Sequence, residues 1–221
     1  MARASGPASV ANLAAETGAE PVEAAQAADD VDVFVLAVPP DAVPKLPASL
    51  FVGRESMIVV DAGNYHPFRD GSIPELEKND LPDSQWVQQQ IGRPVIKALN
   101  SINYKSLSAG GRMRGEADRI ALPISGDSDA AKAVIANIID AIGFDPVNVG
   151  GIADSWRQQP GSPVYCTNLN RDELTLWINK VDRARMPATR SAGADLHASL
   201  PADTKYTIVA ARYREAFLRE G

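Results

Sequence analysis

Residues 31–39 read VDVFVLAVP, and this stretch decides the fold class. Apolar side chains fill residues 33–38 without alternation, which is typical of a strand covered on both faces, as in a parallel sheet. Proline cannot donate to a sheet ladder, so Pro39 ends the strand. Residues 57–61 and 94–100 read MIVVD and PVIKALN, a similar composition. These stretches predict strands in one parallel layer, with residues 33–38 and 95–99 side by side.

Helical patterns separate the predicted strands. The clearest covers residues 131–142, where apolar residues recur at i, i+3, i+4, i+7, i+8 and i+11. Asp127 or Ser128 can cap its start, and Gly143 ends it. Shorter helices are expected at residues 7–18, 21–28 and 84–90, and further strands at residues 120–125 and 145–150. This order predicts an α/β fold with right-handed crossovers and a doubly wound parallel sheet.

Beyond residue 150 the pattern changes to helices and loops. Asn170 and Glu173 have the spacing of a capping box ahead of a helix. Residues 183–203 show no clear period, so we expect a loop or linker there. Residues 206–217 form a last amphipathic helix, whose apolar face must pack on the core or on a second subunit. We therefore divide the chain into a sheet domain, residues 1–150, and a helical C-terminal segment, residues 151–221, and leave a homodimer open.

Charge and composition argue against several classes of protein. The 221 residues carry a net charge of −6, which argues against a general nucleic-acid-binding protein. Apolar runs stay well short of the ~20 residues of a membrane helix, so we expect no membrane association. A single cysteine, Cys166, excludes an internal disulfide and indicates a cytoplasmic protein. We interpret Cys166 as a small buried side chain rather than a nucleophile.

The glycine turn of a dinucleotide site does not occur in this sequence. A pyrophosphate needs Gly-x-Gly-x-x-Gly between a strand and a helix, because only glycines let backbone N–H groups approach it closely. The strands that normally follow this turn are present. We therefore expect a chain that is N-terminally truncated by on the order of 30 residues. A decayed or repurposed protein is the alternative.

Several blocks of the chain, taken in order, resemble one family. They are VLAVP at residues 35–39, VDAGNY at 60–65, VIKALN at 95–100, LPISGD at 122–127 and GGIADSW at 150–156. Together they resemble the predicted dinucleotide-binding enzymes related to deazaflavin (coenzyme F-420)-dependent NADP reductase. The resemblance implies a Rossmann-type domain at residues 1–150, a small-molecule substrate, and hydride transfer between NADP(H) and a deazaflavin or another acceptor. It implies neither a metal ion nor a covalent intermediate, and it assigns no catalytic side chain.

The resemblance also suggests where the cofactor binds. The family reads Ser-Arg-Gly-Pro where this chain has Ser5 before Gly6, and the family's Arg grips the 2′-phosphate of NADP. Arg3 can substitute for it, with hydrogen bonds from Ser5 and Ser9, so NADP is expected and NAD stays open. Further cofactor contacts are expected at the strand ends, from Val38, Pro39, Asp61, Asn64, Ala98 and Asn100.

Three sites that contain polar or aromatic residues have two interpretations each. Alternation along a strand places Lys97 and Asn100 on opposite faces, which argues against a shared catalytic role. Residues 98–100 then either border the nicotinamide or simply end a strand with a solvated Lys97. His66 either orients a substrate or is an ordinary surface-loop histidine. Trp156 either covers the substrate side of the pocket or fills the core.

Two other functions compete with the oxidoreductase. One is a catalytically inactive Rossmann remnant that acts as an interaction protein through its C-terminal helices. The other is a hydroxyacid-type or imine-type dehydrogenase. That class needs a long all-helical second domain, and about 70 residues remain after Gly150. The short C-terminal segment therefore disfavours a hydroxyacid-type or imine-type dehydrogenase.

Overall fold

The computed structural model describes residues 1–3, 5–78 and 81–218. Two parallel sheets form its centre, one of three strands and one of two. The first has the order β1 (Val33–Leu36), β2 (Ile58–Asp61), β3 (Ile96–Lys97), and the second pairs β4 (Ala121–Ile124) with β5 (Asp145–Asn148). An antiparallel bridge between Lys97 and Ser125 joins the two sheets. All five predicted strands are therefore confirmed, and the α/β Rossmann-type class with them.

Helices cover both faces of the three-stranded sheet, because its side chains alternate between two cores. Val59 packs into the core that contains residues of α4 (Asp83–Ile91). Val60, the next residue of β2, packs into the core that contains residues of α6 (Asp129–Ala141). The Ser128 hydroxyl caps α6 by accepting from the N–H of Ala131, as the sequence predicted. Both helices predicted between the strands are thus in place.

β1 pairs on one side only within the described residues, so it is the edge of its sheet. Its register pairs Val35 with Val60, and β2 lies between β1 and β3. The expectation that residues 33–38 and 95–99 are direct neighbours is therefore wrong, although both lie in one parallel layer. Val35 is 48% exposed, against the prediction of a strand covered on both faces. On this face α6 packs mainly over β4 and β5, so the outer part of the edge strand β1 stays exposed.

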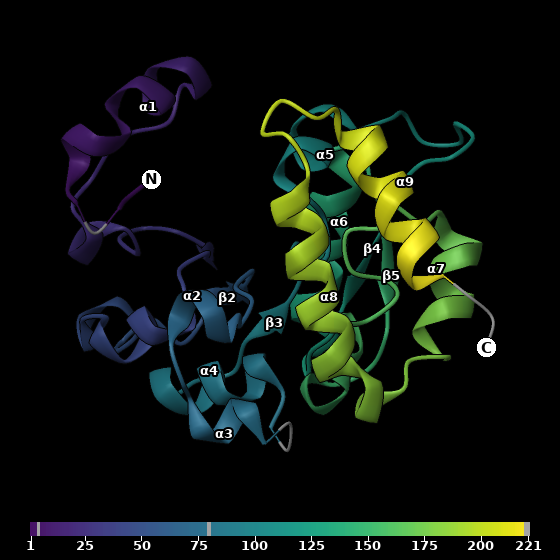
Figure 1. Cartoon of the computed structure of the whole chain (residues 1–221). Coiled ribbons are helices and arrows are strands. Elements are labelled where there is room, and N and C mark those ends of the chain that lie inside the picture. The colour runs from purple at the N-terminus through teal and green to yellow at the C-terminus, as the bar shows by residue number, and fades with distance from the viewer. Residues whose placement is uncertain (4, 79–80, 219–221) are drawn as a thin grey trace.

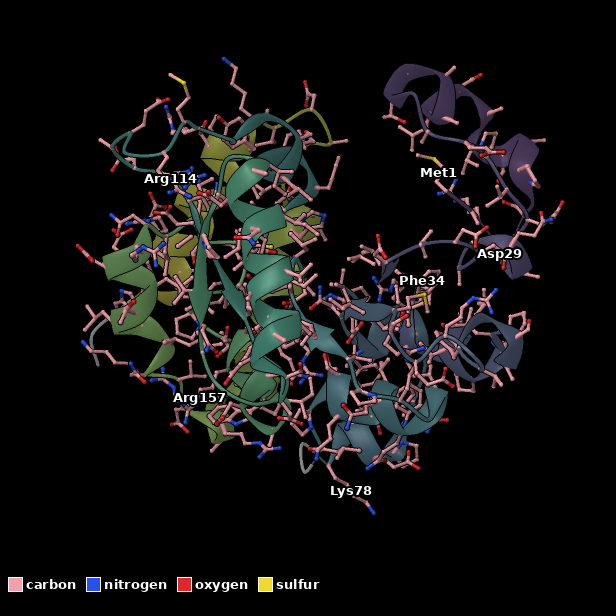
Figure 2. The ribbon with its side chains drawn as sticks, turned by 180° about the vertical axis from the view of Figure 1, so that it is seen from behind. Met1, Asp29, Phe34, Lys78, Arg114 and Arg157 are labelled. Carbon is pink, nitrogen blue, oxygen red and sulfur yellow. The ribbon has the colours of Figure 1, made fainter. Side chains whose placement is uncertain are left out.

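The N-terminal segment stands apart from the sheets, as Figure 1 and Figure 2 show from opposite sides. It consists of η1 (Pro7–Val10), α1 (Ala11–Thr17) and η2 (Ala24–Gln26). Gly18 ends α1 in the left-handed conformation, as its position in the sequence indicates. The helix expected at residues 21–28 is reduced to the short turn η2, since Pro21 and a β-region Glu23 delay its start.

Short helices connect the remaining elements. They are η3 (Pro40–Lys45), η4 (Ala48–Leu50), α2 (Pro67–Asp70), α3 (Pro74–Glu77), α5 (Tyr104–Ala109) and η5 (Ile152–Gln158). Among the helices of the described residues, none is both long and apolar enough to span a lipid bilayer.

After η5, the described part of the C-terminal segment contains α7 (Arg171–Ile178), η6 (Arg183–Arg185), α8 (Met186–Ser199) and α9 (Tyr206–Phe217). The predicted capping box of Asn170 and Glu173 starts α7. The loop expected at residues 183–203 is wrong, because α8 occupies most of it. α8 has no clear apolar period since α9 supplies the bulky side chains: Gly193 lies under the rings of Tyr213 and Phe217. The apolar face of α9 thus packs inside the same chain.

Candidate functional site

A cavity of about 570 Å³ opens at the carboxyl ends of β2 and β3. This is the edge where open α/β sheets bind ligands. The loops that follow the two strands supply one wall, from Ala62 and from Leu99 onward. Residues 160–166 and the helices α8 and α9 supply the opposite wall. The helical segment therefore closes a site that the sheet opens.

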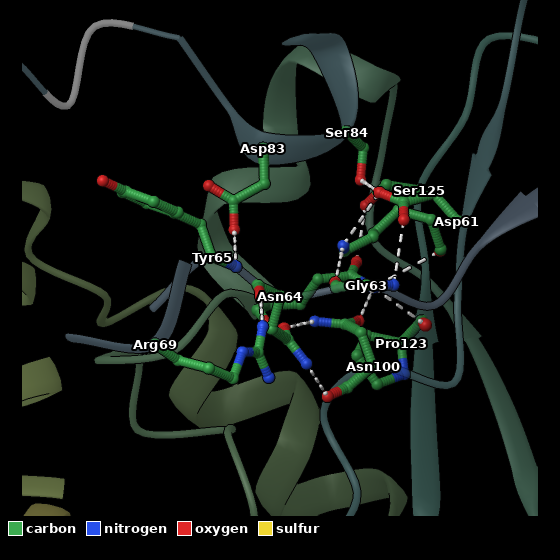
Figure 3. Close-up of polar contacts among 12 residues, drawn as sticks. Asp61, Gly63, Asn64, Tyr65, Arg69, Asp83, Ser84, Asn100, Pro123 and Ser125 are labelled. Atoms are coloured by element: carbon green, nitrogen blue, oxygen red, sulfur yellow. Dashed lines mark hydrogen bonds and ion pairs between the residues drawn. The ribbon is translucent and has the colours of Figure 1, made fainter. Parts of the chain in front are cut away.

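A buried ion pair supports the sheet side of this cavity (Figure 3). The Nζ of Lys97 lies 3.1 Å from a carboxylate oxygen of Asp61, and the two side chains are 0% and 3% exposed. The Ser84 hydroxyl donates to the same oxygen at 2.6 Å, and the N–H of Gly63 donates to the other at 2.9 Å. Lys97 also donates to the Gly63 carbonyl, so one cluster ties β3 to the loop after β2. The expectation of a solvated Lys97 is wrong.

A second buried network holds the two amides that face the cavity. The Asn100 side chain donates to Asn64 Oδ1 at 3.0 Å, and Asn64 donates back to the Asn100 carbonyl at 2.9 Å. Gln158, which is fully buried, donates to Asn100 Oδ1 at 2.9 Å and accepts from the Ser125 hydroxyl at 2.7 Å. Every amide group of this trio has a partner, so Asn64 and Asn100 have fixed orientations.

Leu99 lies between these networks in a strained backbone conformation. Its φ is +62°, in the left-handed region that non-glycine residues rarely adopt. Such strain persists only where the surroundings enforce it, and it concentrates at functional sites. Leu99 lines the cavity, and its neighbours Ala98 and Asn100 are buried. The bend at Leu99 turns the chain from β3 into the cavity wall.

Aromatic and basic side chains form the rest of the lining. The ring of His66 lies 5.3 Å from the ring of Phe68 and 6.3 Å from that of Tyr165. Burial, with the positive charges of Arg69 and Arg190, lowers the pKa of His66 to about 4. His66 is therefore a neutral, half-buried imidazole at neutral pH. The interpretation of His66 as an ordinary surface-loop histidine is wrong.

Cys166 also touches the cavity, but its chemistry is inert. The side chain is 7% exposed, and burial raises the pKa of its thiol to about 12. The thiolate that a nucleophile needs is absent at neutral pH. The interpretation of Cys166 as a buried packing residue is confirmed.

The predicted cofactor residues separate into four groups, three of which lie at or near the cavity. Asn64 and Asn100 line the cavity. Asp61 and Ala98 are 2% and 0% exposed and lie directly behind its wall, where the Asp61 carboxylate holds the loop instead of facing a ligand. Val38 and Pro39 follow β1 at the same end of the sheet, and the Val38 carbonyl approaches Gly63.

Arg3, Ser5 and Ser9 lie elsewhere, in the N-terminal segment outside the cavity lining. The Ser9 hydroxyl donates to the Gly6 carbonyl at 2.6 Å, so it stabilises the local turn. Trp156 is also outside the lining, with the guanidinium carbons of Arg157 and Arg183 5.5 and 5.4 Å from its ring. The interpretation of Trp156 as a pocket cover does not hold in this conformation, and its side chain is half-buried rather than fully buried in the core. The cofactor contacts of the nine residues named in the sequence analysis stay predictions.

Sequence reasoning missed three residues of the site: Gln158, Ser162 and Arg190. Gln158 and Ser162 flank a Pro-Gly break, and Arg190 lies in the stretch without a clear period. A helix pattern of small residues in that stretch, including Ala188, Ala192 and Ala194, was the available signal for α8. The pairing of α8 with the distant loop after β2 had no local signal.

Known proteins match the chain over both its sheet and its helices. The family model described as coenzyme F420-dependent NADP oxidoreductase matches residues 1–65. The crystal structure of hypothetical protein SMa0349 from Sinorhizobium meliloti is 30% identical with a TM-score of 0.66, and the match covers 77% of this chain and 82% of that one. The chain belongs to this family of dinucleotide-binding oxidoreductases.

Two further matches differ in what they cover. The Escherichia coli K12 protein YjhV is 48% identical over 74 residues, which are 34% of this chain and 47% of YjhV. The match thus spans about half the length of YjhV. A structure from Arthrobacter sp. FB24, provisionally described as an F420-dependent NADP-reductase, is 24% identical with a TM-score of 0.50 and covers 63% of this chain and 64% of that one. This last likeness supports the Rossmann-type fold of the family.

Proposed function

We propose that this protein is an NADP(H)-dependent oxidoreductase that passes a hydride between the nicotinamide and a deazaflavin or another small planar acceptor. One observation carries the proposal: the cavity lies at the carboxyl ends of parallel strands and has oriented amides on one wall and aromatic rings on the other. Membership of the dinucleotide-binding family is consistent with it.

The sheet-side wall fits the nicotinamide end of such a cofactor. Asn64 and Asn100 present fixed polar groups beside the apolar Leu99, which suits a ring that carries an amide. Gly63 keeps this wall thin, because a Cβ there would lie 3.1 Å from the Val38 carbonyl. When bound, the cofactor supplies or accepts the hydride, and the side chains of this chain position the two rings and exclude water.

Binding of NADPH to this chain tests the proposal directly. Isothermal titration should show micromolar binding, and Asn64→Ala should weaken it about tenfold, because a buried polar contact contributes on the order of 1.4 kcal/mol. Asn179→Ala is the matched control, since Asn179 is exposed and bonds only to its own helix. Absence of NADPH binding by the folded chain would contradict the proposal.

The choice between NADP and NAD rests on the N-terminal segment. We propose that Arg3, Ser5 and Ser9 contact the 2′-phosphate, at the end of the dinucleotide far from the nicotinamide. Arg3→Ala should then reduce the affinity for NADPH and leave that for NADH unchanged. An equal loss for both nucleotides would remove this assignment. An in-frame search of the coding DNA upstream of Met1 for the glycine turn complements this test.

A second candidate function is a binding module without catalysis, which the exposed edge of β1 favours. β1 pairs only with β2 within the described chain, and Val35 on it is 48% exposed. A second copy is one candidate partner, so light scattering after gel filtration tests the homodimer. An assembly that forms without any NADPH binding would favour this function over the oxidoreductase.

A further inference from the structure

The charge of the cavity lining contrasts with the charge of the protein. The chain has a net charge of −6, yet the lining contains two arginines, Arg69 and Arg190, beside the neutral imidazole of His66 and, among the described residues, no Asp or Glu. The charge of Arg69 is neutralised by Asp70 behind the wall, whose carboxylate accepts a hydrogen bond from the Arg69 guanidinium at 2.9 Å. Excess basic groups in an acidic protein indicate a ligand that is an anion.

Arg190 is the least compensated of these groups. Within the described residues it makes no ion pair, its Nε is buried without a hydrogen-bond partner, and its guanidinium carbon lies 5.8 Å from the centre of the Tyr65 ring. The positive charge of Arg190 slightly favours the ionised carboxyl of Asp83, but burial has the larger effect and raises the pKa of Asp83. The Asp83 carboxyl instead accepts a hydrogen bond from the N–H of Tyr65 at 3.1 Å. Arg190 therefore has donors left for a ligand.

Two further unpartnered polar atoms belong to the same lining. Ser162 is 1% exposed and its Oγ has no partner, and the Nδ1 of His66 is buried without one. Buried polar atoms without partners are rare, because leaving them unpaired costs free energy. Three such atoms come here from separate parts of the chain: the loop after β2, the segment after η5, and α8. A serine hydroxyl, an imidazole and a guanidinium can all donate to an oxyanion.

We propose that Arg190, Ser162 and His66 form a subsite for a carboxylate or phosphate group of the substrate. The aromatic residues His66, Phe68 and Tyr165 beside it suit a flat ring on the same molecule. Assigning the anion to the substrate rests on the proposed function, which places the nicotinamide against Asn64, Leu99 and Asn100. The subsite itself requires only the folded chain. Arg190 then acts as the specificity-determining residue of the site.

Benzoate and benzamide test the subsite in the whole chain without NADPH, because they share a ring and differ in charge. Titration calorimetry should show benzoate binding at least tenfold more tightly than benzamide. Arg190→Met should abolish this preference, and Ser162→Ala should reduce it several-fold. Arg185→Met, an exposed arginine just before α8, should keep it. Phenyl phosphate in the same series shows which oxyanion the subsite prefers.

Three results would overturn the subsite. They are equal affinities for benzoate and benzamide, a preference that Arg190→Met retains, and displacement of benzoate by adenosine 2′,5′-bisphosphate. The last would assign these donors to phosphates of the cofactor. Ser162→Ala removes one oxygen from a small side chain and keeps the test valid if Arg190→Met does not fold. Failure of NADPH binding leaves this result untouched, so the two proposals fail separately.

Discussion

The two walls of the cavity differ in how their polar groups are satisfied. On the sheet side, Lys97 and Asp61 pair with each other, and Asn64, Asn100 and Gln158 bond among themselves. On the helix side, polar atoms of Ser162 and Arg190 have no partner. The ion pair and the amide network of the first wall are complete without a ligand, whereas Ser162, Arg190 and, at the edge of the first wall, Nδ1 of His66 still lack partners.

This difference separates a scaffold from a recognition surface. A network whose members are all satisfied is rigid, so changes in it should lower the stability of the fold. A surface with spare donors contributes little to stability, so changes in it should alter binding. Substitutions within the sheet-side networks should therefore lower the stability of the fold more than substitutions on the helix side, and the following experiments measure this stability.

Removing the charge of Lys97 should have the largest effect. Lys97→Met leaves the Asp61 carboxylate buried without its cation, which costs roughly 3–5 kcal/mol of unfolding free energy. Urea denaturation followed by circular dichroism measures it. Lys45→Met is the control, because Lys45 pairs with Asp41 on the surface and its side chain is 73% exposed. Similar losses for both variants would contradict the rigid-scaffold interpretation.

Gln158→Leu should have the next largest effect. The substitution removes the acceptor of the Ser125 hydroxyl and the donor to Asn100 Oδ1, and their loss costs roughly 2–3 kcal/mol. The same denaturation experiment applies, with Gln90→Leu on the exposed side of α4 as the control. A neutral Gln158→Leu would show that the amides of the sheet-side wall do not depend on one another.

Lowering the pH should destabilise the fold through His66. Its pKa is lowered to about 4 by burial, Arg69, Arg190 and His197, against the partial opposition of Asp70, while its ordinary value is 6.5. Between these values the unfolded chain binds more protons, so the stabilisation is complete above 6.5 and decreases as the pH falls toward 4. The melting temperature should therefore drop more steeply with falling pH in the wild type than in His66→Asn. Parallel curves would refute this.

Gly193→Ala should have the smallest effect, and a favourable one. A Cβ at Gly193 meets only ring atoms of Phe217 and Tyr213 at 3.6–3.8 Å, which are ordinary contacts. Alanine in a helix is about 1 kcal/mol more favourable than glycine, so the melting temperature should rise slightly. Gly161→Ala is the contrasting variant and should lower it, because φ is +99° there and a Cβ would lie 2.3 Å from the Met186 carbonyl.

The sheet was predictable because its signals are local. Apolar runs marked the first four strands, and Ser128 and Asn170 marked the starts of α6 and α7. The predictions failed where a distant partner decides the outcome. α8 has no apolar stripe of its own because α9 brings the rings, and Lys97 is buried because Asp61, 36 residues away, neutralises it. Of the predicted site, Asn64 and Asn100 reach the cavity, and Arg190 could not be foreseen.

The sequence alone determined that this protein is built around parallel strands whose ends carry polar loops, because strand burial and helix capping depend on neighbouring residues. Only the tertiary structure decided which polar groups meet. It enclosed Lys97 with Asp61 and brought α8 over the loop after β2, so that Arg190 and Ser162 share one cavity with His66. The reason is physical: charge compensation and enclosure depend on contacts between residues far apart in the chain, and these contacts form only when the chain folds.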